Sequence, residues 1–229
     1  MQHHEQHLQS SDTIRDIVIG MSDGLTVPFA LAAGLSGAIN SSGIVVTAGI
    51  AEIVAGSIAM GLGGFLAGRT EADHYVSELK REYEEVARVP EQEKQEVMEV
   101  FAGFGLSAKL QREVADEMAK DNDKWVDFMM KYELGLEKPE ANRATQSAVT
   151  IGLSYVVGGI IPLSPYFFVA DSHLALYYSC AITMVCLFVF GYFKSRVTGQ
   201  PAIAGAFKVL IIGALAAAAA FGMAKWING

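Results

Sequence analysis

The chain has 229 residues, of which 52% are hydrophobic and 18% charged, and its formal net charge is −8. Several apolar stretches of twenty residues or more exclude a single water-soluble domain. The acidic balance disfavours nucleic-acid binding. The two cysteines, Cys180 and Cys186, lie inside one apolar stretch and predict neither a disulfide framework nor a thiolate metal site.

Five stretches have the length of membrane-spanning helices, which need about 20 apolar residues each. They are residues 14–39, 44–68, 144–167, 173–194 and 201–226. Short loops join them, except that residues 69–143 form a polar insert between the second and third. The sequence therefore predicts an all-α, polytopic membrane protein with a helical domain inserted between its second and third spans. Residues 1–13 are expected to be a tail without function, although His3, His4 and His7 could bind a metal weakly.

The first apolar stretch contains Asp23, five residues before Pro28. A carboxylate within a bilayer is costly and persists when a partner, water or a bound cation offsets the cost. Proline interrupts the helical hydrogen bonds. A buried acid beside such a break predicts an ion site inside the membrane.

The second apolar stretch contains Glu52 and Met60. Asp23 is nine residues from Ile14 and Met60 nine from Arg69, so both are expected about 13 Å from one membrane surface. Glu52 shares a helix face with Met60 and continues the path toward the other surface. A methionine alone is usually a packing residue, but with a carboxylate it favours Fe²⁺ over Ca²⁺ or Mg²⁺. The stretch also has small residues typical of close helix packing, within the chain or across a dimer: Gly49, Gly56, Gly61, Gly63, Gly64 and Gly68.

The insert carries the acidity, because residues 71–142 hold 19 acidic and 10 basic side chains, a net charge of −9. Three helices are predicted: 69–88 as a continuation of the second span, about 90–105 beginning at Pro90, and 107–134 between Ser107 as N-cap and Gly135 as stop. The third is expected to bury one apolar stripe, formed by Leu110, Val114, Met118, Trp125, Phe128 and Met129.

Each insert helix also carries a pair of potential metal ligands at a spacing of three or four residues, which places both on one face. The pairs are Glu82 and Glu85, Glu93 and Glu96, and Met129 and Glu133. Facing one cleft, they could bind a divalent cation, and the sulfur would favour a borderline metal. The alternative is that these glutamates are ordinary solvated surface residues.

Positive charges predict the orientation, since Lys and Arg near span ends concentrate on the cytosolic side. With five spans, Arg15, Arg69, Arg143, Lys194 and Arg196 all flank one surface, and Lys225 flanks the other. The N-terminus and residues 69–143 are therefore expected in the cytosol.

Two motifs and the insert resemble the vacuolar iron transporter family. The motifs are D-I-V-I-G-M-S-D-G-L-T-V-P-F at 16–29 and A-E-I-V-A-G-S-I-A-M-G at 51–61. The resemblance, from about Ser11 to the end, implies a homodimer of five-span protomers in the vacuolar membrane. It implies proton-coupled transport of Fe²⁺, often with Mn²⁺, from the cytosol into the vacuole.

The resemblance also implies two sets of site residues. The membrane set is Asp23 and Met60, and the cytosolic set is Glu82, Glu85, Glu93, Glu96, Met129 and Glu133. Divalent ions are expected as substrate or bound ligand, with Fe²⁺ first and Mn²⁺ or Zn²⁺ as further candidates, and no prosthetic group is expected.

A rival interpretation is a membrane-tethered, ferritin-like protein that binds or oxidises iron without transporting it. Such di-iron sites use two Glu-x-x-His pairs on bundle helices. The insert has a single histidine, His74, and cannot supply both pairs. We therefore do not expect an enzyme.

Overall fold

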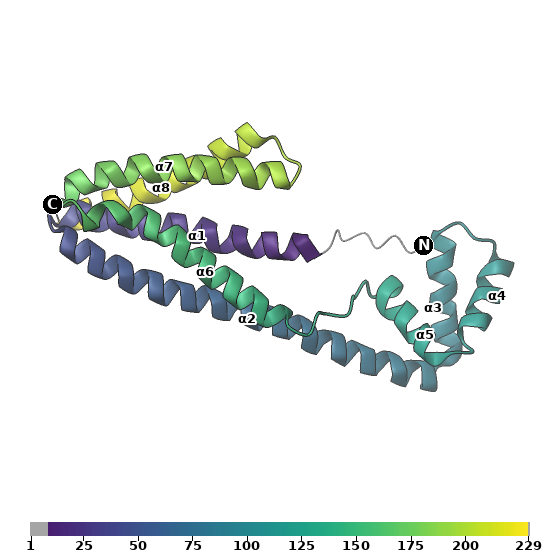
Figure 1. Ribbon diagram of the computed structural model, residues 1–229. Helices are drawn as coiled ribbons and strands as arrows, with labels where there is room; N and C mark the ends of the chain where they lie inside the picture. The colour runs from purple at the N-terminus through teal and green to yellow at the C-terminus, as the bar shows by residue number, and fades with distance from the viewer. Residues whose placement is uncertain (1–8, 229) are drawn as a thin grey trace. The chain divides into compact units, whose positions relative to one another are not determined.

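The computed structural model describes residues 9–228, and every regular element in this part of the chain is a helix (Figure 1). His3, His4 and His7 lie outside the described residues. The prediction of an all-α protein with five spans is confirmed, because five described helices are long and apolar enough to cross a membrane. They are α1 (Gln9–Ala38), α2 (Ser42–Arg88), α6 (Arg143–Leu163), α7 (Ser172–Val197) and α8 (Ala202–Asn228).

The chain divides into two compact units, and α2 contributes to both. Residues up to Phe65 and from Ala144 onward form the membrane unit, and Leu66–Arg143 form the insert. The polar half of α2 stays helical because Glu, Lys and Arg are good helix formers. Pairs four residues apart, such as Arg69 with Asp73 at 3.3 Å, add to its stability.

In the membrane unit, α6 packs between α1 and α2 through glycines that let the backbones touch (Figure 1). A methyl group on Gly158 of α6 would lie 2.9 Å from the Leu25 backbone nitrogen of α1. A methyl group on Gly61 of α2 would lie 2.9 Å from the Ala148 carbonyl oxygen of α6. Glycine is therefore required here for close approach rather than for backbone conformation.

We expect Gly158→Ala to destabilise the membrane unit, because its methyl group would meet backbone atoms that cannot rotate away. Overpacking of this kind typically costs about 1–3 kcal/mol. The control is Gly222→Ala in α8, where an added methyl group meets no atom within 4 Å and alanine is the better helix former. Thermal unfolding in detergent checks this, and equal melting temperatures for the two variants would contradict the packing.

A set of hydrogen bonds joins the α1–α2 loop to the start of α7. The side chain of Asn40 donates to Asp171 Oδ2 (3.1 Å) and accepts from the Ser172 backbone N–H (3.0 Å). Ser172 Oγ donates to the Ile39 carbonyl (2.8 Å), and Asp171 caps α7 by accepting from Leu174 N–H. The backbone N–H of Leu174 and the Asn40 amide lower the pKa of Asp171. The carboxylate of Asp171 therefore stays charged in moderately acidic surroundings. The hydrogen bonds between the α1–α2 loop and α7 are then retained as well.

The insert contains α3 (Pro90–Gly103), α4 (Ala108–Met118), α5 (Asn122–Phe128) and a π-helix, Met129–Glu133. The predicted single helix 107–134 is therefore wrong, and so is the three-helix count. Helix α4 ends at Met118, and a new helix starts at Asn122 because Asp121 caps it. The Asp121 side chain accepts a hydrogen bond from the Lys124 N–H. Pro90 and Gly135 do lie at a helix start and stop, Gly135 with φ +65°.

The break in the helix also divides the predicted apolar stripe. Trp125 and Met129 are buried in the core of the insert, beside Val97 of α3. Leu110 belongs to the separate helix α4 and stays 45% exposed. The core is built by α3, α5 and the π-helix, together with Val86 of α2 and Ala115 of α4, against which Met118 packs.

Candidate functional site

Tyr155 is a buried polar residue at the place where α1, α2 and α6 meet. Its side chain is 2% exposed, and its hydroxyl donates a hydrogen bond to Glu52 Oε1. Gly24, next to Asp23, packs against the Tyr155 backbone, and Gly56, one turn after Glu52, packs against its ring and hydroxyl. Two glycines therefore make the room that lets this tyrosine reach a carboxylate inside the membrane unit.

Glu52 retains unused acceptor capacity. Its second oxygen, Oε2, is buried and has no hydrogen-bond partner among the described residues. An unpaired buried carboxylate oxygen is costly unless a proton or a cation joins it. Asp23 is half-buried on α1, at the level where Gly24 meets α6. These two acids have the properties expected of binding groups rather than of packing residues.

Met60 lies half-buried on α2, next to the glycine that contacts Ala148. Within the described part of one chain, no hydrogen bond or ion pair links Asp23, Glu52 and Met60. In the same part, no group of three or more His, Cys, Asp or Glu side chains lies close enough to hold a metal ion. One copy of the membrane unit thus offers these candidate ligands separately.

The insert buries two glutamates, Glu82 on α2 and Glu93 on α3, each 2% exposed. The Oε2 atom of each is buried without a hydrogen-bond partner among residues 9–228. Surface glutamates would be solvated, so the interpretation as ordinary surface residues fails for these two. Two buried acceptor oxygens without donors favour a bound cation or proton.

Three further acids complete what we call the carboxylate cluster: Glu82, Glu85, Glu93, Glu96 and Glu133. Burial raises the pKa of Glu93 to about 7, helped by repulsion from Glu96, Glu82, Glu85 and Glu133. Partial desolvation of the exposed Glu133 and the charges of Glu96, Glu82 and Glu85 likewise raise its pKa to about 7. Burial and the charges of Glu85, Glu96 and Glu78 raise the pKa of Glu82. The charges of the cluster therefore act on Glu82, Glu93 and Glu133 together.

Met129 is fully buried at the start of the π-helix, in the apolar core with Trp125. Glu133 ends the same element, so the predicted pair lies on a π-helix rather than on an α-helix. π-helical turns are frequent at functional sites. The structure thus places the thioether in the core and Glu133 in the carboxylate cluster.

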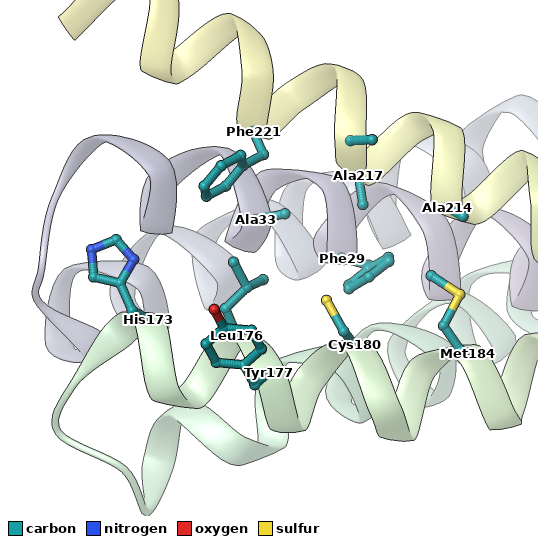
Figure 2. Close-up of a pocket in the computed structure, with 11 residues that line it drawn as sticks. Phe29, Ala33, His173, Leu176, Tyr177, Cys180, Met184, Ala214, Ala217 and Phe221 are labelled. Atoms are coloured by element: carbon teal, nitrogen blue, oxygen red, sulfur yellow. The ribbon is translucent and has the colours of Figure 1, made fainter. Parts of the chain in front are cut away.

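A cavity of about 330 Å³ lies among α1, α7 and α8 of the membrane unit. Figure 2 shows its wall built from Phe29, Ala217 and Phe221, with the sulfur-bearing side chains of Cys180 and Met184 beside them. Hard, hydrated divalent cations require oxygen ligands, and this wall is mainly carbon and sulfur. The cavity is therefore unsuited to the carboxylate chemistry described above.

Comparison with known proteins decides the family. The model of the VIT family matches residues 14–225. Vacuolar iron transporter 1 of Tulipa gesneriana is 54% identical, over 99% of this chain and 92% of its own length. The chain belongs to the VIT family. Vacuolar iron transporter 1 of Arabidopsis thaliana is 53% identical over 99% and 90% of the two chains. Protein CCC1 of Saccharomyces cerevisiae is 38% identical over 94% and 69%.

In this VIT-family chain, the predicted site residues fall into two groups by their surroundings. The five glutamates of the insert are linked by electrostatic repulsion, although in the described chain no three of them lie close enough to hold a metal ion together. Asp23, Glu52 and Met60 share the membrane unit, and among the described residues no hydrogen bond or ion pair joins them. Sequence reasoning missed Tyr155, although a tyrosine within an apolar helix needs a hydrogen-bond partner and Glu52 was the available acceptor. It also missed Arg81, although Glu85 follows it by four residues, the spacing at which side chains of opposite charge pair on a helix.

Proposed function

We propose that this chain moves Fe²⁺ from the cytosol into the vacuole in exchange for protons, with Mn²⁺ as a second substrate. The observation that carries the proposal is the buried, unpartnered Glu52 oxygen, together with half-buried Asp23, inside the membrane unit of a VIT-family chain. Relatives that cover nearly the whole chain are named vacuolar iron transporters. No observation favours an enzymatic role over transport.

In the proposed mechanism, Asp23 and Met60 hold the ion within the membrane. A carboxylate and a thioether together suit a borderline divalent metal. A proton arriving from an acidic vacuole neutralises Asp23 or Glu52 and weakens its hold on the metal, because a carboxylate must be deprotonated to bind a metal ion. The Tyr155 hydroxyl fixes one oxygen of Glu52 and leaves the other to exchange a proton or an ion.

A homodimer would bring two half-buried ligand sets together. The α2 face beside Met60 carries exposed small residues at intervals of four, namely Ala51, Ala55, Ala59 and Gly63. Small residues at this spacing allow two membrane helices to approach closely. Gly49, Gly56, Gly61 and Gly64 instead contact α6 residues of the same chain, whereas an added methyl group on Gly63 meets nothing within 4 Å. We therefore propose that the alanine–Gly63 face of α2 packs against a second copy.

The insert, on the cytosolic side in this proposal, captures the metal through the carboxylate cluster. Its excess of negative charge attracts divalent cations, and Glu82 and Glu93 supply oxygens that have no other partner. Met129 contributes sulfur only if the core around it opens, since its side chain is fully buried.

Metal binding by the insert is expected to weaken as the pH falls from 7.5 to 6. Glu93 and Glu133 have pKa values of about 7, and a carboxylate must lose its proton to bind metal. Lowering the pH through this range should reduce the apparent metal affinity roughly tenfold if one of these two glutamates binds the metal, and by a further tenfold if both do. Co²⁺ titration calorimetry on the full chain carrying Asp23→Asn, which removes the membrane ligand, measures this. Affinity that is constant between pH 6 and 7.5 would contradict it.

The proposed function is tested by Fe²⁺ uptake into proteoliposomes with an acidic interior. We expect uptake that needs the pH gradient and consumes no oxygen. Uptake that persists without the gradient would contradict the proposal that transport is coupled to protons. Oxygen consumption without uptake would instead support an iron-oxidising protein.

A further inference from the structure

Arg81 is a positive charge among the carboxylates of the insert. Its Nη2 atom lies 2.6 Å from Glu78 Oε2 and 3.9 Å from Glu82 Oε1, and its Nε atom lies 3.6 Å from Glu85 Oε2. The side chain is 51% exposed, so its guanidinium can move into solvent. Glu82, in contrast, is buried. A half-exposed cation thus contacts two members of the carboxylate cluster.

The influence of Arg81 extends beyond its own helix. Its charge opposes the rise in the pKa of Glu82 on α2 and of Glu133 on the π-helix. Other basic side chains of the insert pair elsewhere: Lys80 lies 3.8 Å from Glu84, and Lys94 lies 3.0 Å from Asp116. Arg81 is therefore placed to neutralise part of the cluster when no metal is present.

We propose that Arg81 is a resident cation of the carboxylate cluster, which competes with the divalent metal for Glu82 and Glu85. This rests on the proposed function, in which the cluster captures Fe²⁺. Glu78 lies outside the cluster and makes the closest contact with the guanidinium. When metal binds, Arg81 gives up Glu82 and Glu85 and keeps Glu78.

Arg81 leaves two buried oxygens of the cluster without a partner. Glu82 Oε2 and Glu93 Oε2 stay buried and without a hydrogen-bond partner in the described chain, even with the guanidinium nearby. The guanidinium lies near Glu82 Oε1, at 3.9 Å, and does not hydrogen-bond to Glu82 Oε2. Arg81 therefore lowers metal affinity without closing the site, and it speeds release. A capture domain that must pass its metal onward needs reversible binding of this kind.

The test measures Co²⁺ affinity and release on the full chain in detergent, with Asp23→Asn in every variant to remove the membrane ligand, and compares Arg81→Gln with Lys80→Gln. Both substitutions remove one positive charge from neighbouring positions of α2, but Lys80 pairs with Glu84, outside the cluster. We expect Arg81→Gln to tighten binding about tenfold, the effect of losing a nearby charge at a partly exposed site. Lys80→Gln should change it less than about twofold. Arg81→Lys, which keeps the charge but loses the fork, should fall between Arg81→Gln and wild type.

Release into a chelator, followed by stopped flow, should slow by a similar factor in Arg81→Gln. Unchanged or weaker binding in that variant, or an equal gain in Lys80→Gln, would overturn the role of Arg81. Glu93→Gln separates this outcome from failure of the proposed function. If Glu93→Gln leaves Co²⁺ binding intact, the cluster is not the capture site. If it weakens binding while Arg81→Gln has no effect, only the competition is wrong.

Discussion

Asp23→Asn is expected to reduce Fe²⁺ uptake into proteoliposomes by at least about 100-fold. The substitution keeps the size of the side chain and removes the charge that would hold a cation within the membrane. Loss of an outer-shell partner of a metal site already costs about 10- to 100-fold, and we propose that Asp23 contacts the ion. The half-buried position of Asp23 beside Gly24 accommodates an amide, so the fold should persist.

The matched control is Asp12→Asn on the same helix. Asp12 is 48% exposed and lies 3.5 Å from Arg15, a surface pair worth less than about 1 kcal/mol. It should transport like wild type, and both variants should melt near the wild-type temperature. Normal uptake by a correctly folded Asp23→Asn variant would remove Asp23 from the transport path.

The double substitution Glu82→Gln with Glu93→Gln is expected to abolish high-affinity Co²⁺ binding by the insert and to stabilise the metal-free protein. The folded-state pKa of Glu93, about 7, exceeds the value of 4.5 expected when unfolded. The native state then binds more protons than the unfolded state between these values, so stability falls as the pH rises through this window. At pH 7.5, keeping Glu93 ionised in the folded protein lowers the free energy of unfolding by as much as about 3 kcal/mol. Glutamine carries no charge and removes this loss of stability.

The gain in stability should be present at pH 7.5, shrink as the pH falls, and vanish below pH 4.5, where the glutamates become protonated in both states. Glu84→Gln with Glu91→Gln is the control, because both acids are exposed on α2 and α3 and make the same change in net charge. It should alter neither binding nor stability strongly. Retained Co²⁺ affinity in the Glu82, Glu93 double variant would exclude the cluster as the capture site.

Much of the helical layout follows from sequence because its causes are local. Five apolar stretches of sufficient length predict five spans, and Pro90 and Gly135 mark ends of helices. The break after Met118 has a local cause too, the capping carboxylate of Asp121, but the apolar spacing from Leu110 to Met129 outweighed that signal. Apolar spacing alone does not distinguish one long helix from two short ones.

The site is less accessible to sequence reasoning, because its properties arise from contacts between distant segments. Pairs of glutamates at helical spacing predicted which acids share a face. Burial of Glu82 and Glu93 depends on how α2, α3 and the π-helix pack. The contacts of Arg81 with Glu82 and Glu85, in contrast, lie within α2 and follow from helical spacing. Likewise, the bond between Tyr155 and Glu52 joins residues 103 positions apart.

The glycine contacts around α6 bear on how a transport cycle could move. A slide of α6 along its axis would carry a side chain into each place where Gly158 now meets α1 or Gly61 meets Ala148. Because these close contacts oppose sliding, we expect α1, α6 and the first half of α2 to move together as a single rigid body. Because Gly37 of α1 also packs closely against Phe221 of α8, alternating access then requires either repacking of that contact or displacement of this body against another protomer.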